Sequence, residues 1–279
     1  MQDKTRREYL RLADHFLESR FIDSKPTVKT VSQMLHNVAC EYRPAYWRRL
    51  KTALALYSED KGNPETAAKI RGLVNPTTSC SPHLKKPKQR RVKSVSDEDH
   101  EKLIAHLKAH KDIECLAAVL TVYFTGCRPA EIQNISLNRN QTITIFSAKK
   151  IGAIRGCDRQ LKLSNEAYRT LALLLPNISH AKAGKTSDIS RIQRRLQRHV
   201  KKIWPKRKHH ISLYSYRHQL GANLKDSRFS RGEVAAIMGH RSHDSVDVYG
   251  DKRASNQKLG IEALLACETL QVRQSPLKS

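Results

Sequence analysis

Acidic residues are scarce in this sequence. Its 279 residues include 26 Asp and Glu against 52 Lys and Arg, which gives a formal net charge of +26. Such a chain repels cationic partners and attracts polyanions, and duplex nucleic acid, with one negative charge per ~1.7 Å, is the commonest polyanion that matches it. A ribosomal protein or a merely soluble basic protein has a similar composition, so the charge favours nucleic acid but leaves these alternatives open.

The sequence also lacks paired cysteines, a secretory leader and a long apolar run. Its six cysteines are scattered without a CxxC pair, which argues against a zinc ribbon or a disulfide framework. The start, "MQDKTRREYL", is charged, and the apolar run "CLAAVLTVYF" has only half of the ~20 residues that cross a bilayer. We therefore expect a cytoplasmic, nucleoid-associated protein with no membrane partner.

The first part of the chain favours a helical bundle followed by a linker. Apolar residues recur at three- and four-residue spacing in "REYLRLADHFLESRF", and helical patterns continue to about residue 79. Prolines, serines and a run of cations then interrupt them, which predicts an extended linker over residues 80–95. Because domains cluster at ~100 to 150 residues, we place one domain at residues 1–79 and a second at residues 96–279.

The second domain is predicted to be mainly helical around a small sheet. Ser96 is a helix N-cap followed by three acidic residues, and "IECLAAVLTVYF" predicts a buried helix. Alternating Ile143 and Ile145 in "QTITIFSAK", and alternating leucines in "RQLKLS", predict two strands. From Asn165 onward the chain reads as helical, including "LGIEALLAC" at residues 259–267. The fold class is therefore mainly α with a small antiparallel β-sheet (α+β).

Two short motifs in the second domain carry arginines suited to phosphate chemistry. In "FTGCRPAEI", Arg128 lies at a turn between two helices, where a fixed guanidinium suits phosphate oxygens or else pairs with Glu131 or a helix end. In "LYSYRHQLGANL", Arg217 shares a helix face with Tyr214. A second arginine aimed at the same point would clamp a phosphoryl group from another side.

The third motif, "MGHRSHDSVDVYGDKR", contains His240, His243 and Tyr249. A metal site here would need ligands beyond the two histidines, and neither Cys267 nor His218 stands at a spacing that completes a known set. We therefore predict no metal. A tyrosine has an ordinary pKa near ~10, so as a nucleophile it would need help from its neighbours.

In this order and with these spacings, the three motifs resemble those of the tyrosine recombinase, or phage integrase, family over about residues 97 to 255. The resemblance implies that Tyr249 attacks the scissile phosphate, forms a 3′-phosphotyrosyl bond and releases a 5′-hydroxyl, with no metal, ATP or other cofactor. It also implies a lysine as general acid in the turn of the small sheet, either Lys149, which we prefer, or Lys150. Where the family's HxxR motif has histidine, this chain has Tyr214, and a phenol does not accept a proton near pH 7. The implied catalytic set is Arg128, Lys149, Tyr214, Arg217, His240 and Tyr249.

The resemblance also implies how the protein meets its partners. Two domains would form a C-shaped clamp round double-stranded DNA, four protomers would synapse two sites as a homotetramer, and an accessory DNA-bending protein is a further candidate partner. The expected function is integration or excision of a mobile element by site-specific recombination. The alternatives are a type IB topoisomerase, which relaxes supercoils by the same chemistry, and a DNA-binding relic that has lost catalysis. The cations expected to lie along phosphates are Lys85, Lys86, Lys88, Arg90, Arg91, Lys93 and Lys150.

Overall fold

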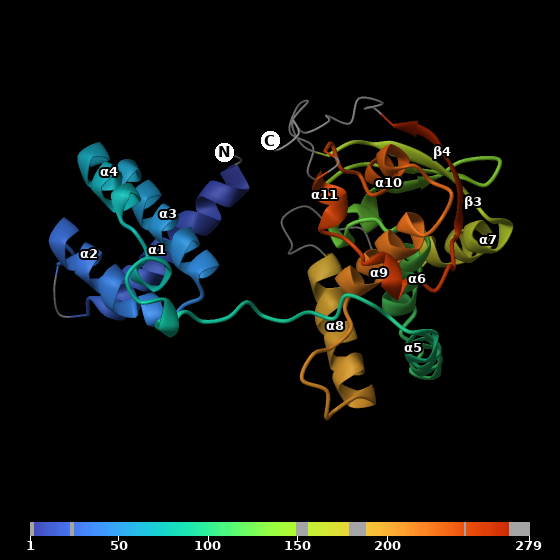
Figure 1. Ribbon diagram of the computed structural model, residues 1–279, viewed down its shortest axis with the longest axis horizontal. Helices are drawn as coiled ribbons and strands as arrows, with labels where there is room; N and C mark the ends of the chain where they lie inside the picture. Colours follow the sequence, from blue (N-terminus) through green and yellow to red (C-terminus); the bar gives the residue numbers. More distant parts are fainter. Residues whose placement is uncertain (1–2, 23–24, 149–155, 179–187, 243, 268–279) are drawn as a thin grey trace. The chain divides into compact units, whose positions relative to one another are not determined.

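The computed structural model describes residues 3–22, 25–148, 156–178, 188–242 and 244–267. The chain divides into two compact units, Met1–Gln89 and Arg90–Ser279, and each has a hydrophobic core of its own (Figure 1). None of the helices in the described stretches is long and apolar enough to span a membrane.

The first unit is a helical bundle, as the periodicity predicts. Its core lies between α1, α2, α3 and α4, and Trp47, which is 3% exposed, donates its indole N–H to the carbonyl of Leu35 at 2.8 Å. A capping box of Thr27 and Thr30 starts α2. In the described residues the α-helices of this unit are α1 (Asp3–Arg20), α2 (Val28–Asn37), α3 (Pro44–Asp60) and α4 (Pro64–Gly72).

The second unit is mainly helical. Ser96 caps α5 as predicted, and its side chain accepts the backbone N–H of Asp99 at 3.2 Å. A capping box of Ser230 and Glu233 starts α10. The α-helices in the described part of this unit are α5 (Asp97–Ala109), α6 (Ile113–Thr125), α7 (Asn165–Leu174), α8 (Asp188–Ile203), α9 (Leu213–Lys225), α10 (Arg231–Ile237) and α11 (Asp244–Asp247).

An antiparallel sheet completes the second unit. The described strands pair in the order β1-β2-β3-β4, and each pairs antiparallel with its neighbour. The two predicted strands are confirmed as β2 and β3, with Ile143 paired to Leu161. The strands are β1 (Ile135–Leu137), β2 (Thr142–Ile145), β3 (Arg159–Leu163) and β4 (Ile261–Cys267).

The prediction of helix for residues 259–267 is wrong. Ile261–Cys267 forms β4 along β3, with Leu163 opposite Ile261 and two irregularities in the register. The strand covers an edge of β3 that would otherwise expose unpaired backbone groups, and it buries Ile261 to 4% exposure. This part of the chain therefore belongs to the sheet of its own unit.

Three helices of the second unit come together at one point. Helix α9 contacts both α6 and α10, and Figure 1 shows it beside them. Helix α6 ends at Gly126, which has a left-handed φ of 61°, and α10 ends two residues before Gly239, which has φ 65°. Both helices thus turn their free C-terminal carbonyl groups toward the buried side of α9, and the candidate site lies there.

Candidate active site

Three arginines donate to successive carbonyl groups at the C-terminal end of α10. The last carbonyls of a helix have no partner within it and carry the negative end of the helix dipole, so they suit guanidinium donors. Each arginine comes from a different element, β3, α9 or the turn after α6. The donor and acceptor pairs are Arg159 Nε to Ile237 O at 2.7 Å, Arg217 Nη2 to Met238 O at 2.6 Å and Arg128 Nη2 to Gly239 O at 3.0 Å.

Gly239 makes room for this arrangement. A Cβ atom added there would lie 2.8 Å from Nη1 of Arg159 and 3.1 Å from Nη1 of Arg128, and the positive φ independently disfavours a side chain. On the other side, Arg217 Nη1 donates to the carbonyl oxygen of Gly126 at the end of α6. The "TGCR" and "MGH" turns are therefore built so that guanidinium groups can approach one another closely.

Glu131 supplies the negative charge that permits the cluster. Its carboxylate accepts from Arg128 Nη1 at 2.7 Å and from Arg159 Nη2 at 2.9 Å, and it is fully buried. Burial alone would raise the pKa of this carboxyl, but the charges of Arg159 and Arg128 outweigh burial and hold its pKa at about 2. Arg128 thus pairs with Glu131, as one reading of the sequence allows, and the pair fixes the orientation of its guanidinium.

The cluster has a strong positive field. Burial, followed by the charge of Arg128, lowers the pKa of Arg217 to about 10, so this guanidinium stays charged at pH 7. Burial and then the Arg217 charge lower the pKa of His240 to about 2, so its imidazole is neutral. With three arginines and one carboxylate, the cluster carries about two positive charges and suits an anion.

Buried N–H donors remain unpaired in this cluster. Arg217 Nη2 donates to His240 Nε2 at 3.0 Å, so the proton of the neutral imidazole is on Nδ1. Among the described residues, that Nδ1 has no hydrogen-bond partner, and neither has Nε of Arg217 nor Nη1 of Arg159. Buried donors are nearly always paired in native proteins, so three in one place indicate a site for an acceptor such as a phosphate oxygen.

Tyr249 lies directly against these groups. The ring of His240 is 4.9 Å from the Tyr249 ring between centroids, and the guanidinium carbon of Arg217 is 4.8 Å from the same centroid. The tyrosine follows α11 rather than lying on a helix, and it is half-buried. The structure therefore brings together four residues of the predicted set: Arg128, Arg217, His240 and Tyr249.

Several solved structures share the fold of this chain. A lambda integrase dimer bound to a COC′ core site matches with a TM-score of 0.63 and 15% identity, over 91% of this chain and 73% of that chain. The Tn1549 transposon integrase in complex with transposon right end DNA matches with a TM-score of 0.58 and 14% identity, over 90% of each chain. A lambda integrase tetramer bound to a Holliday junction gives 0.59 and 14%, over 91% of this chain and 73% of that chain. The chain has an integrase-type fold. No family model matches it, and no curated protein matches it in sequence.

The integrase-type fold does not bring every predicted residue to the cluster. Tyr214 is half-buried on α9, one turn before Arg217, and makes no side-chain hydrogen bond or ring contact with any described residue. Lys149, Lys150 and His243 lie outside the described residues.

The C-terminal end of the predicted linker is fixed to the same helix in this fold. Val95, which is 3% exposed, donates its backbone N–H to the side chain of Gln219 on α9 at 2.9 Å. Next to it, the charges of Lys93 and Arg91 act on His218. At the other end, Lys86 donates to the carbonyl of Glu41 within the first unit at 2.6 Å. The other linker cations of the predicted set, Lys85, Lys88, Arg90, Arg91 and Lys93, have exposed side chains.

Two residues of the site were not among the sequence predictions. Arg159 shares strand parity with the buried Leu161 and Leu163, and a charged residue at an inward position of a strand is the signal that could have revealed it. His218 follows Arg217 directly, and its ring stacks on Tyr249 with 4.8 Å between centroids. Only the fold shows that contact, because the two rings are 31 positions apart in the sequence.

Proposed function

We propose that the chain is a site-specific DNA recombinase of the tyrosine recombinase family, which cuts and rejoins duplex DNA through a 3′-phosphotyrosyl intermediate on Tyr249. The observation that carries the proposal is the contact of the Tyr249 ring with His240 and Arg217, both of which hold buried, unpaired N–H donors. A nucleophile beside such donors can attack a bound phosphodiester. The integrase-type fold supports the same reading.

In the proposed reaction the phenol oxygen of Tyr249 bonds to phosphorus while the bond from phosphorus to the 5′-oxygen breaks. Arg128 and Arg217 bind the non-bridging oxygens and offset the charge that develops on them, and His240 donates from Nδ1. The phenol gives its proton to solvent water as it attacks, and the leaving 5′-oxygen gains one from Lys149 or Lys150. Because the phosphotyrosyl bond keeps the energy of the broken bond, rejoining needs no ATP. The proposed chemistry also uses no metal, since the arginines supply the positive charge.

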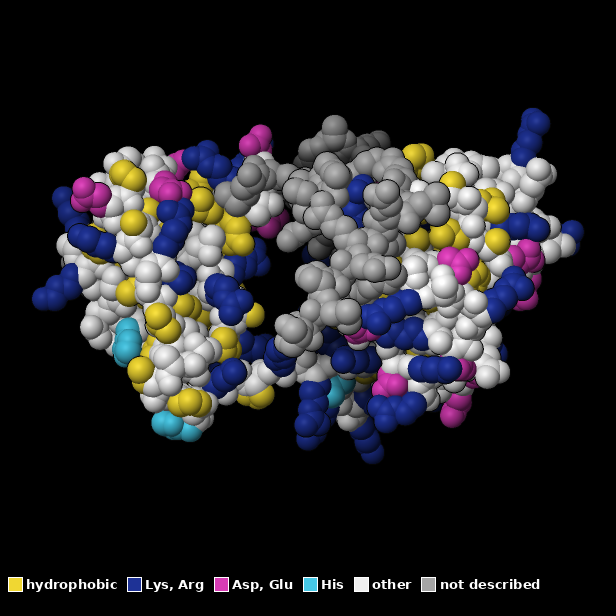
Figure 2. Space-filling view, turned by 45° about the horizontal axis from the view of Figure 1, so that its top comes forward, with side chains coloured by type: hydrophobic (Ala, Val, Ile, Leu, Met, Phe, Trp, Pro, Cys, Tyr) yellow, Lys and Arg dark blue, Asp and Glu magenta, His cyan; other side chains and the backbone are white. Residues whose placement is uncertain are grey.

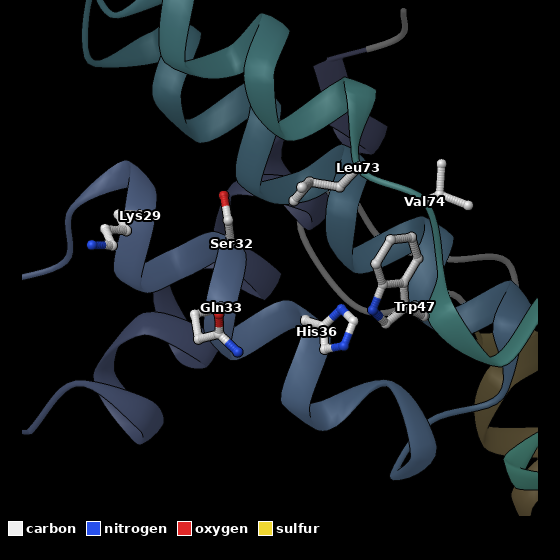
Figure 3. Close-up of a pocket in the computed structure, with 7 residues that line it drawn as sticks. All are labelled: Lys29, Ser32, Gln33, His36, Trp47, Leu73 and Val74. Carbon is white, nitrogen blue, oxygen red and sulfur yellow. The ribbon is translucent and has the colours of Figure 1, made fainter. Parts of the chain in front are cut away.

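Residues 1–79 are proposed as a DNA-binding domain, joined by a linker of residues 80–95 to a catalytic domain of residues 96–279, with the two domains clamping the duplex. A surface hollow of about 350 Å³ in the first unit, lined largely by polar side chains, supports the proposal that this unit contacts DNA. Figure 3 shows polar side chains following one another along α2 at this hollow, and none of the described residues that line it is acidic. Its lining residues are Lys29, Ser32, Gln33, His36, Trp47, Leu73 and Val74.

A cationic surface on α8 adds to the proposed DNA contacts. The apolar side of this helix is buried, whereas its other side and the loop after it are exposed and basic, and Figure 2 shows dark blue side chains projecting from this lower part of the second unit. In the described chain none of the following exposed cations has a carboxylate partner, so they are free to neutralise phosphates. They are Arg194, Arg198, Lys201, Lys202, Lys206 and Lys208.

The proposed assembly of this chain rests on its structural similarity to integrases that were solved as oligomers on DNA. The matched lambda integrase structures are a dimer on a core site and a tetramer on a Holliday junction, and the Tn1549 protein is a transposon integrase. We propose that this chain likewise acts as a homotetramer on two synapsed DNA sites and integrates or excises a mobile element, with an accessory DNA-bending protein as a candidate partner.

Covalent capture on nicked suicide substrates tests the proposal. The purified chain is incubated with a pool of such duplexes cut from the genomic region around its gene, and trapped DNA is sequenced. We expect a covalent complex with the wild-type chain and none with Tyr249→Phe, because phenylalanine has no oxygen to attack with. Phe keeps the ring between His240 and His218, so loss of capture cannot be attributed to a packing defect.

The outcomes separate the alternatives. Capture by the Tyr249→Phe variant would overturn the assignment of the nucleophile, and binding without any capture by the wild-type chain would identify a DNA-binding relic. Relaxation of a supercoiled plasmid without exchange between two captured sites would identify a topoisomerase. Recombinant junctions between two sites are the result that the proposal requires.

A further inference from the structure

The backbone that carries Tyr249 is tied directly to α9. The N–H of Gly250 donates to Nδ1 of His218 at 3.4 Å, and the carbonyl of Gly250 accepts from Nζ of Lys225 at 2.8 Å. One turn of α9 separates each of these two side chains from Gly221 in the helix. The segment is therefore held at both its N–H and its carbonyl by one helix.

Close backbone packing reinforces these bonds. A Cβ atom on Gly250 would lie 2.2 Å from the backbone nitrogen of Ala222, and one on Gly221 would lie 3.3 Å from Cβ of Tyr249. Gly250 also has a φ of 68°, a conformation that favours glycine. The two glycines thus let the main chain after Tyr249 lie directly on the main chain of α9.

His218 contacts both the nucleophile and its backbone. Its ring is stacked on Tyr249 at an interplanar angle of 27°, while its Nδ1 faces the N–H of Gly250. An N–H donor facing Nδ1 requires the lone pair there, so the proton of the neutral ring is on Nε2. His218 in this arrangement orients the tyrosine and is not a base at Nδ1.

We propose that His218 is the positioning residue for the Tyr249 nucleophile, a role that its stack on the phenol ring and its bond from Gly250 assign to it rather than to Tyr214. The inference rests on the proposed function, because it concerns the same tyrosine. Tyr214, which occupies the histidine position of the linear motif, makes no side-chain hydrogen bond or ring contact with the described residues of the cluster. The imidazole that contacts the nucleophile therefore comes directly after Arg217 on α9, at His218, whereas the motif places it three residues before Arg217.

The surroundings of His218 keep its lone pair available. Burial, followed by the positive charges of Lys93, Arg217, Arg91 and Lys225, lowers the pKa of this imidazole to about 4. The ring is therefore neutral at pH 7 and can accept from the backbone N–H.

Three substitutions separate the acceptor at Nδ1 from the stacked ring. His218→Phe keeps a flat ring but has no acceptor, His218→Asn keeps an acceptor near the Nδ1 position, and His218→Ala has neither. Single-turnover capture of the suicide substrate at saturating DNA is expected to slow by about tenfold to a hundredfold in the Phe and Ala variants, as for a misplaced reacting group. The Asn variant is expected to recover most of the rate. DNA affinity should change by less than a factor of two or so in all three.

The controls keep failure of this inference distinct from failure of the proposed function. His110→Ala, at the exposed C-terminal end of α5 and outside the proposed DNA contacts, should capture DNA at the wild-type rate. Wild-type rates in all three His218 variants, or a larger loss in Tyr214→Phe than in His218→Ala, would overturn the inference while leaving Tyr249 as the nucleophile. If the wild-type chain captures no DNA, the proposed function fails instead.

A measurement without DNA tests the geometry on its own. In protein labelled with ¹⁵N at histidine and glycine, the side chain of His218 should show the neutral form with its proton on Nε2 at pH 7. The backbone N–H of Gly250 should shift in His218→Phe but little in His218→Asn. A proton on Nδ1 of His218 would overturn the proposed bond, whatever the activity of the chain.

Discussion

Glu131 is the one carboxylate among the described residues of the arginine cluster, and acid should act on the protein through it. Its folded pKa of about 2 lies below the ordinary 4.5, so its contribution to the free energy of unfolding is complete above pH 4.5 and is lost as the pH falls toward 2. Linkage gives a loss of about 1 kcal/mol by pH 4 and about 2 kcal/mol by pH 3.

Glu131→Gln tests this linkage. Removing one member of a buried ion pair is expected to lower the free energy of unfolding by roughly 3 to 5 kcal/mol at pH 6, because Arg159 and Arg128 are left uncompensated. The difference from wild type in urea unfolding should shrink as the pH falls to 4. Glu262→Gln, which removes an exposed ion pair with Lys162, should cost less than ~1 kcal/mol, and an equal cost would contradict the role given to Glu131.

At the residue scale the sequence indicates the cluster only in part. Arg128, Arg217, His240 and Tyr249 stand in short motifs whose spacing can be read directly, and the structure brings them together. The contact of His218 with Tyr249 depends on how the segment after α11 folds back on α9, which no local pattern records. Tertiary packing decides such contacts, and the motif itself points to Tyr214.

Strand β4 is expected to be a structural part of the second unit. A chain ending at residue 257 would lose the pairing with β3 and the burial of Ile261, together worth at least ~3 kcal/mol. Since each kcal/mol shifts the melting temperature of a 150 to 250-residue domain by ~2 to 4 °C, melting should fall by about 10 °C. Differential scanning calorimetry measures this.

A second truncation is the matched control. A chain ending at Cys267 keeps all of β4 and should melt about 10 °C above the chain ending at residue 257. Equal melting of the two truncated chains would show that β4 contributes nothing to the sheet.

Local sequence explains why β4 escapes prediction. The segment "IEALLAC" is rich in Ala, Leu and Glu, which favour helix, and its apolar residues do not alternate regularly. The irregular register against β3 breaks the alternation that identifies a strand. In contrast, Ile143 and Ile145 in β2 alternate cleanly, and that strand is predicted correctly.

At the scale of the whole molecule, DNA binding should depend steeply on salt. Exposed cations lie along the predicted linker and on α8. Each phosphate that a cation neutralises adds ~0.9 to the steepness with which log affinity falls against log salt. Replacing five linker cations with Gln should therefore lower the slope by up to about 4.5. The five are Lys85, Lys88, Arg90, Arg91 and Lys93, whereas Lys86 is left in place because it bonds to Glu41.

Fluorescence anisotropy on a labelled duplex at several salt concentrations measures this slope. The matched control replaces Lys102, Lys108 and Lys111, which are exposed on α5 and just after it, and should change the slope by less than about 1. An equal change of slope per replaced cation in both sets would mean that the linker contacts no phosphate and that its charge acts only at long range.

The chain after Tyr249 has no slack. Ala254 accepts from Gln219 at 2.7 Å, and Asn223 bonds to the side chain of Asn256 and the carbonyl of Lys258, each at 2.7 Å. A DNA end covalently joined to this tyrosine would be attached to a segment that is hydrogen-bonded along α9 and that continues into strand β4 of the sheet. Transfer of that end to a new partner strand would therefore require movement of the DNA or rotation of a whole protomer, because the backbone after Tyr249 cannot extend.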